Sequence, residues 1–278
     1  MEQARGFFRK VIEIIKKPEM RILPGQLAFF LFMSLIPLAA LIGAIASTLS
    51  IPVASLRQTM SGMPKEAIDV FIEIINNKGI NFNISVFFIS AFILASNGPH
   101  SMIITSNEIY KIESRNVIAR RIKAIMMTFV MVGLFFVLFL IPIFGDSIFE
   151  MIRNNIDDES LIKLIYIIYQ LIKYPVLLII LHFNIKLLYV IAPDEHIESM
   201  TTTQGAIFTT VGWIIATEIY SFYIGSFTSY DKFYGSISNI IILLLWIYIL
   251  SYIFVLGMII NAGTYKEKTK EIKVVENE

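Results

Sequence analysis

Long stretches of this chain carry no charged residue, and that feature restricts its fold more than any other. No Asp, Glu, Lys or Arg lies between Arg21 and Arg57, or between Lys78 and Glu108. A helix needs about 20 apolar residues to cross a hydrocarbon layer about 30 Å thick. Only 16% of the 278 residues are charged, against roughly 25% in soluble domains. The sequence therefore predicts an all-α integral membrane protein.

Six segments have the length and composition of membrane-spanning helices. They lie near residues 25–49, 84–105, 124–145, 165–191, 206–227 and 236–263. Lys173 and Lys186 interrupt the fourth segment toward its ends, where long side chains can reach the head groups. We expect residues 24–264 to form one transmembrane domain of six helices.

The basic residues are distributed unevenly between the two sides of this predicted topology. The N-terminus, the 106–123 and 186–205 loops and the C-terminal tail together hold 16 of the 23 Lys and Arg residues. The positive-inside rule therefore predicts a multi-pass protein with both termini in the cytoplasm. The net charge of +1 argues against a nucleic-acid partner, because such proteins carry a clear basic excess.

Three segments are expected outside the membrane core. Residues 1–23 are predicted to form an interfacial helix with one apolar face, made of Phe7, Phe8, Val11, Ile12 and Ile15. The first outer loop shows helical spacing of its apolar residues, at Ile68, Phe71, Ile72 and Ile75. Residues 265–278 have mixed charge and no apolar face, which predicts a disordered cytoplasmic tail.

Ionisable residues inside a membrane are candidates for a functional site, because burying them is costly. Glu218 lies about 18 Å into the fifth predicted span, and His182 lies about 14 Å from the cytoplasmic end of the fourth. These two side chains are predicted at one level, with Lys186 one turn below His182. The alternative is an interhelical hydrogen bond that only holds the helices together.

The second predicted span contains the sequence Ser96-Asn97-Gly98-Pro99-His100. Pro99 has no amide proton and disfavours helical geometry at Gly98, so we expect a kink or a break there. Broken spans are typical of transporter sites, although a simple packed kink is equally common. Pro37 predicts a similar kink in the first span.

Enzyme functions find little support in the residues. The chain has no cysteine, three histidines without metal-ligand spacing, and no phosphate-binding loop. Asp194-Glu195-His196 follows Pro193 and is interpreted as a solvated turn rather than a metal site. We therefore expect no enzyme activity, no metal and no cofactor.

Several motifs resemble the YihY/virulence factor BrkB family. The first span contains Ala28-Phe29-Phe30 followed by Ser34-Leu35-Ile36-Pro37. Further matches are Asn107-Glu108-Ile109-Tyr110, Glu113-Ser114-Arg115 and Arg120-Arg121. The most specific match runs from Tyr230 to Ala262, with Tyr234-Gly235-Ser236, Trp246, Gly257 and Asn261-Ala262.

This resemblance implies a six-helix protein of the plasma (inner) membrane, in a family once labelled ribonuclease BN by mistake. It also suggests a connection with envelope lipids. Basic residues of the 107–123 segment would then contact lipid phosphates: Lys111, Arg115, Arg120 and Arg121. The alternative is that these charges only set the topology.

The leading hypothesis is a transporter or flippase-like protein for an amphipathic cell-envelope compound such as a lipid. A polar cleft lined by Asn97, His182, Lys186 and Glu218 would bind the head group, and kinks at Pro37 and Pro99 would permit rearrangement. The alternative is a non-transporting structural or scaffolding protein of the envelope. The expected partners are membrane lipids, with a second copy of the chain or other envelope proteins as further candidates.

Overall fold

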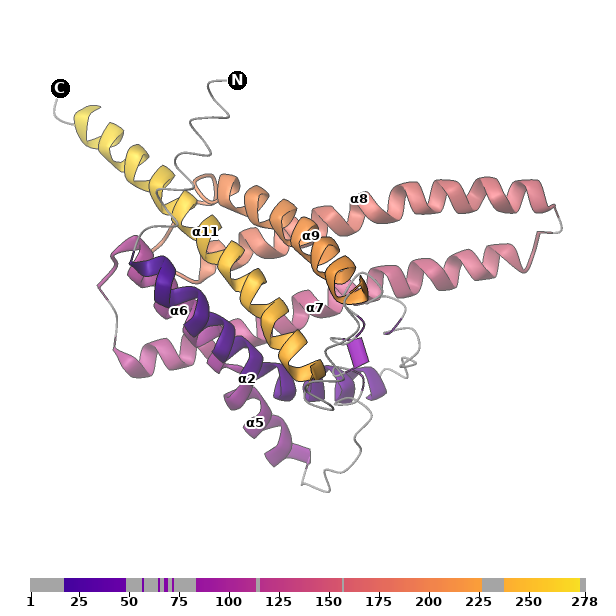
Figure 1. The fold of residues 1–278 in the computed structure, drawn as a ribbon, viewed down its shortest axis with the longest axis horizontal. Coiled ribbons are helices and arrows are strands. Elements are labelled where there is room, and N and C mark those ends of the chain that lie inside the picture. The colour runs from indigo at the N-terminus through magenta and orange to yellow at the C-terminus, as the bar shows by residue number, and fades with distance from the viewer. Residues whose placement is uncertain are drawn as a thin grey trace.

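The computed structural model describes residues 18–48, 84–113, 116–156, 158–226 and 238–275, and five isolated positions (57, 65, 68, 69 and 72). These residues form seven helices and no strand (Figure 1). The helices are α2 (Glu19–Thr48), α5 (Ile84–Ala95), α6 (Asn97–Tyr110), α7 (Val117–Arg153), α8 (Glu159–Ile191), α9 (Thr203–Ser226) and α11 (Ser238–Val275).

The helices pack in a closed order. α2 packs on α6, α6 on α7, α7 on α8, α8 on α9, α9 on α11, and α11 on α2 again. α6 also touches α11 across this ring, and ten of its 14 residues are buried. The main core joins side chains from four helices, Leu27, Ile103, Tyr189 and Phe254, each at most 1% exposed. The short and polar α6 therefore lies in the interior of the bundle.

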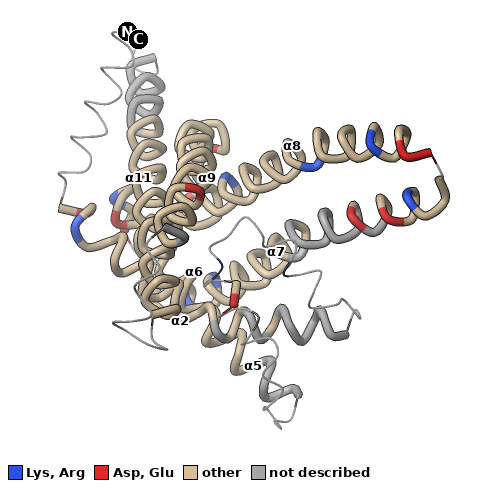
Figure 2. Tube along the Cα trace, turned by 45° about the vertical axis from the view of Figure 1, so that its right-hand side comes forward, with Lys and Arg blue, Asp and Glu red and all other residues tan. Residues whose placement is uncertain are grey.

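α7 and α8 continue beyond the bundle as an arm, here defined as residues 145–156 and 158–175. With 37 and 33 residues, the two helices are about 55 Å and 50 Å long. Figures 1 and 2 show their distal halves leading away from the other helices, with charged residues gathered at the tip. An ion pair of 2.7 Å between Asp146 and Lys173 joins the two helices of the arm.

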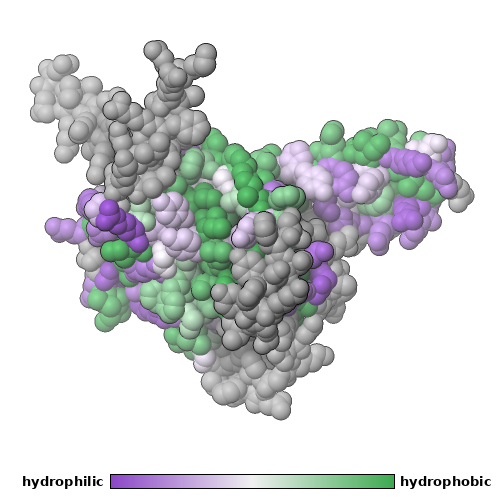
Figure 3. Space-filling view, viewed as in Figure 1, coloured by the Kyte–Doolittle hydropathy of each residue, from purple (hydrophilic) through white to green (hydrophobic). Residues whose placement is uncertain are grey.

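The surface agrees with a lipid environment. Large apolar side chains are exposed along α8, including Ile167, Leu171 and Ile179 at 61–73% exposure. Figure 3 shows hydrophobic side chains over the centre of one face and a mixture of hydrophobic and hydrophilic ones on the arm. An exposed apolar surface of this extent is typical of a protein that contacts lipid or a partner.

The all-α membrane architecture predicted from the sequence is confirmed. Three segments of the described chain are long and apolar enough to cross a membrane: 159–191 in α8, 203–224 in α9 and 238–265 in α11. The other predicted spans overlap α2, the α5–α6 pair and α7. The number of six spans and the orientation stay predictions.

The segments predicted to lie outside the membrane core are described only in part. Residues 1–17 of the predicted interfacial helix lie outside the described residues, and 19–23 form the beginning of α2. Of the four apolar residues that predict a helix in the first outer loop, Ile68 and Ile72 are described, and both are buried.

The predicted disordered tail is instead helical as far as Val275, because α11 continues through it. Lys and Glu dominate residues 266–273, and both are strong helix formers. Extending an existing helix also requires no new nucleation step.

Candidate functional site

The helix is interrupted at one residue between α5 and α6. α5 ends at Ala95, Ser96 forms a turn, and α6 begins at Asn97 with Pro99 in its first turn. A proline there is tolerated, because the first amide groups of a helix have no intrahelical acceptor. The Ser96 hydroxyl donates to the Ile93 carbonyl oxygen at 2.7 Å. Pro37, by comparison, lies inside α2, which runs without interruption.

A guanidinium group holds the two sides of this break together. Arg121 of α7 donates from Nη1 to Asn97 Oδ1 at 2.9 Å and from Nη2 to the Ile93 carbonyl oxygen at 2.8 Å. The planar fork of an arginine suits such a double contact. One charged residue of α7 therefore binds the last turn of α5 and the first residue of α6.

The break also packs closely on α2. A Cβ atom added to Gly98 would lie 2.6 Å from Ser34 Oγ, so only glycine fits without a shift. The Ser34 hydroxyl donates to the Phe30 carbonyl oxygen at 2.7 Å, one turn before Pro37. The two proline-containing segments thus lie next to each other.

Beyond the break, α6 carries buried hydroxyl groups. The side-chain oxygens of Ser101, Thr105 and Ser106 have no hydrogen-bond partner in the described part of the chain. All three residues are at most 1% exposed. Buried hydroxyl groups without a partner are costly, and a bound water or ligand is one way to satisfy them. α6 therefore offers polar groups in the interior that can bind such a molecule.

A second polar cluster, called here the anchor cluster, consists of Asn107, Lys123 and Asp194. Asn107 Nδ2 donates to Asp194 Oδ2 at 2.7 Å, and the Asp194 backbone amide donates to Asn107 Oδ1 at 2.9 Å. Lys123 Nζ lies 3.1 Å from Asp194 Oδ1 and donates to the carbonyl oxygens of Ala192 and Pro193. The anchor cluster joins α6, α7 and the turn that follows α8.

Sequence reasoning missed the anchor cluster. Asp194 was expected in a solvated turn, but its side chain is only 1% exposed, so that interpretation is wrong for this residue. The exposed Glu195 and His196 do lie at the surface. No local signal separates Asp194 from these neighbours, because its partners lie 87 and 71 residues away in the chain.

The four residues predicted to line one cleft have different surroundings in the structure. His182 Nδ1 lies 3.3 Å from Thr210 Oγ1, and Asn97 binds Arg121. Lys186 is half-buried on α8, whereas Glu218 is exposed on α9. Across the described residues, no hydrogen bond or ion pair joins any two of these four side chains.

The predicted phosphate-binding residues also have different surroundings. Lys111 is exposed and pairs with Glu108 at 2.9 Å and with Glu19 at 3.3 Å. The hydrogen bond to Glu108 is the main cause that raises the pKa of Lys111 above its ordinary value. Arg120 is half-buried with its Nε atom unpartnered, and Arg115 lies outside the described residues. Arg121 belongs to the α5–α6 break.

These features describe an α-helical integral membrane protein with a polar break inside its bundle. In the described ranges, no group of three or more acidic or histidine side chains is placed to hold a metal ion. The chain belongs to the BrkB virulence factor family, whose profile matches residues 12–277, as the sequence motifs predicted.

Individual relatives agree with this assignment. The chain is 29% identical over 249 residues to the ribonuclease-like protein YfkH of Bacillus subtilis (strain 168), covering 88% of this chain and 90% of YfkH. It is 27% identical over 90 residues to a UPF0761 membrane protein of Glaesserella parasuis serovar 5 (strain SH0165), or 32% of this chain and 30% of the relative. A UPF0761 membrane protein of Pseudoalteromonas translucida (strain TAC 125) is 30% identical over 95 residues, or 33% and 32% of the two chains. No solved structure matched the chain.

Proposed function

We propose that this protein moves an amphipathic cell-envelope compound, such as a lipid, across the plasma (inner) membrane. The observation that carries the proposal is the α5–α6 break. There a guanidinium group contacts Asn97 and a backbone carbonyl group, and unpartnered hydroxyl groups follow on the next turns of α6. Broken helices with exposed polar backbone are typical of transporter sites.

The chemistry of the break suits an anionic or hydrogen-bonding head group. Arg121 contributes a permanent positive charge, and its contacts to Asn97 and Ile93 are to neutral acceptors. A phosphate oxygen is a stronger acceptor for a guanidinium than an amide oxygen is. A head group could therefore replace Asn97 at Arg121 and release the two helices from each other. Such a release would couple binding to rearrangement.

Three further charged or polar side chains would act outside the break. Lys186 and Glu218 form no ion pair with any described residue. Among the described residues, the hydrogen-bond partner of His182 is the Thr210 hydroxyl group. Charged groups in a membrane segment usually face a polar path or a partner. In this proposal they bind the head group at other stages of its movement. No catalytic step, metal or cofactor is involved.

Transport of a fluorescent phospholipid in proteoliposomes tests the proposal. We expect Arg121→Gln to slow the movement of labelled phosphatidylglycerol by about tenfold to a hundredfold, since a hydrogen bond to a charged group contributes about 1.5–3 kcal/mol. Glu218→Gln should also slow the movement of the labelled lipid. Because Glu218 is exposed, misfolding would not explain a slower rate in this variant. Lys163→Gln, on the exposed arm, is the matched control and should leave the rate unchanged.

The outcomes separate transport from a structural role. Absence of lipid movement by the wild-type protein, with labelled phosphatidylglycerol and phosphatidylethanolamine alike, would contradict the proposal. Thermal unfolding of each variant in detergent would show whether a slow variant is still folded. Unchanged transport by folded Glu218→Gln would remove this residue from the path.

A scaffolding role is the second candidate, and the exposed arm favours it. The arm carries apolar side chains such as Leu164 and Leu171 at 52% and 73% exposure, together with charged residues at its tip (Figure 2). Envelope proteins or a second copy of the chain could bind this surface. A scaffold would tolerate changes at Asn97 and Arg121 but be sensitive to changes on the arm.

A further inference from the structure

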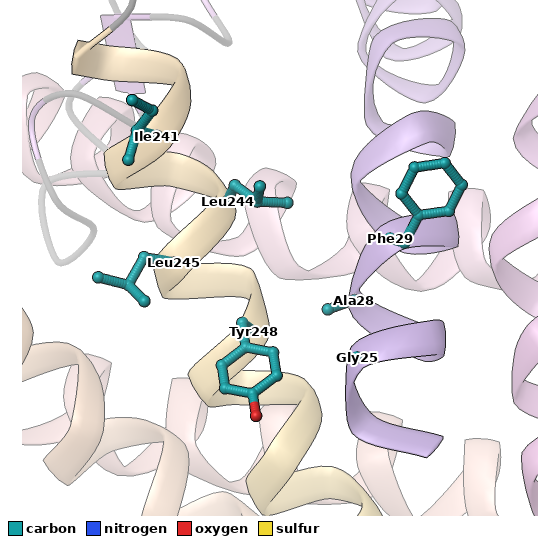
Figure 4. A pocket seen from close by; sticks show the side chains of 7 residues that line it. All are labelled: Gly25, Ala28, Phe29, Ile241, Leu244, Leu245 and Tyr248. Carbon is teal, nitrogen blue, oxygen red and sulfur yellow. The ribbon is translucent and has the colours of Figure 1, made fainter. Parts of the chain in front are cut away.

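An apolar groove lies between α2 and α11, on a face of α2 that the polar break does not use. It has a volume of about 360 Å³ and is lined by Gly25, Ala28, Phe29, Ile241, Leu244, Leu245 and Tyr248. Figure 4 shows the side chains of Ala28 and Leu244 both directed into the space between the two helices. Because Gly25 and Ala28 have little or no side chain, the helix surface is hollow there.

The exposed apolar residues around the groove indicate that it faces hydrocarbon rather than water. Phe29, Leu244 and Leu245 are 55%, 38% and 42% exposed, and α11 is long and apolar enough to cross a membrane. An apolar groove on such a surface is filled by lipid chains or by another protein. The groove extends from Ile241 to Tyr248, which is about 10 Å along the helix axis. That length fits within one leaflet of a hydrocarbon layer about 30 Å thick.

The end of the groove near Gly25 carries a positive charge. Arg21 lies four residues before Gly25 on α2, so both are on the same face of the helix. Arg21 is exposed and forms no ion pair with any described residue. Side chains of a helix lean toward its N-terminal end, which directs Arg21 away from the apolar groove and toward the head groups. The hydroxyl group of Tyr248 lies at the same end of the groove.

We propose that this groove binds one acyl chain of an anionic phospholipid whose head-group phosphate pairs with Arg21. The lipid belongs to the leaflet that contains the N-terminal end of α2. Apolar side chains bind the tail, and the unpaired guanidinium group selects the charge of the head group. This site is separate from the α5–α6 break and does not depend on transport.

Photochemical labelling in vesicles tests this site. The protein is reconstituted in phosphatidylcholine vesicles that contain a minor fraction of phosphatidylglycerol with a photoreactive group at the middle of its acyl chain. After irradiation, mass spectrometry locates the labelled peptides. We expect labels to concentrate on residues 25–29 and 241–248, above the level on the exposed apolar face of α8.

Two glycine variants give a matched comparison. A Cβ atom at Gly25 would lie 4.0 Å from its nearest neighbour, Tyr248 Cε2, so an added Cβ has room there. The remaining atoms of the leucine in Gly25→Leu are expected to occupy the groove. A leucine displaces roughly two methylene groups of the ligand, which should reduce labelling of the groove by about tenfold. Gly133 of α7 has no atom within 4 Å of such a Cβ, so Gly133→Leu should leave the labelling unchanged.

Replacing the charge tests the head-group part of the proposal. Arg21→Gln should reduce labelling by the phosphatidylglycerol probe to the level given by a phosphatidylcholine probe with the same acyl chain. Equal labelling of the groove and of α8, or no effect of Gly25→Leu, would overturn the proposal. Absence of any label in the groove would also overturn it, because a protein partner there would exclude the probe. An unchanged preference for phosphatidylglycerol in Arg21→Gln would overturn the pairing with phosphate.

Discussion

Asp194→Ala should lower the free energy of unfolding by about 3 kcal/mol, because it leaves a buried amide without its acceptor and breaks an ion pair whose carboxylate is buried. The Asn107 side chain loses its 2.7 Å hydrogen bond to the carboxylate. Lys123 loses its charged partner but keeps two backbone carbonyl oxygens, so the expected loss is at the lower end for buried ion pairs. Equilibrium unfolding in mixed micelles of mild detergent and dodecyl sulfate would measure the change.

The neighbouring acid provides the control for this experiment. Glu195 is exposed and forms no ion pair with any described residue, so Glu195→Ala should have almost no effect on the free energy of unfolding. Asp194→Asn should have an intermediate effect, because it keeps an oxygen that accepts from Asn107 but loses the charge. If Asp194→Ala and Glu195→Ala unfold alike, the anchor cluster does not stabilise the bundle.

The long apolar helices could be predicted from the sequence because the membrane imposes a simple rule of length and polarity. The predicted fourth span ends at Ile191, and so does α8. The distal ends of α7 and α8 were less predictable: α7 continues to Arg153 and α8 begins at Glu159, beyond the apolar stretches. A helix does not have to end where the hydrocarbon ends, and the Asp158 side chain provides an N-cap for α8 outside the apolar segment.

The polar contacts could be predicted only in part. The missing amide proton of Pro99 predicts a kink or a break near this residue. The helix is interrupted at Ser96, three residues before it. Arg121 donates hydrogen bonds to both sides of that break. The sequence predicts a different role for it, as a phosphate ligand or as a positive charge that sets the membrane topology, because it lies in a basic segment. Its contacts to Asn97 and Ile93 depend on the crossing of α7 over α5 and α6, and no local pattern describes such a crossing.

Family motifs identified one important contact without explaining it. From the sequence alone, Gly257 and Asn261 stand out only as parts of the family motifs. In the structure they form a close contact between α9 and α11. Asn261 Oδ1 accepts a hydrogen bond from the Gly205 amide at 2.7 Å. A Cβ atom at Gly257 would lie 2.8 Å from the Gly205 carbonyl oxygen. Small residues permit this approach of two helix backbones in a membrane.

A matched pair of glycine variants on α11 would measure the importance of this contact. Gly263 has no atom within 4 Å of an added Cβ. We therefore expect Gly263→Ala to be neutral or to stabilise the helix by up to about 1 kcal/mol, the usual advantage of alanine over glycine. It controls for any general effect of adding a methyl group to this helix.

Gly257→Ala should be among the most destabilising single changes in the bundle, with a loss of about 3 kcal/mol or more. The new methyl group would overlap Thr209 Oγ1 and the Tyr189 hydroxyl group, which are hydrogen-bonded to each other at 2.6 Å. Tyr189 also donates to the Phe254 carbonyl oxygen at 2.8 Å, so one methyl group disturbs the contacts of α8, α9 and α11 together. Thermal unfolding in detergent should show a large decrease in the midpoint temperature for Gly257→Ala and none for Gly263→Ala. Equal midpoints would mean that α9 and α11 can separate at little cost, and the close glycine contact would then not hold the ring of helices closed.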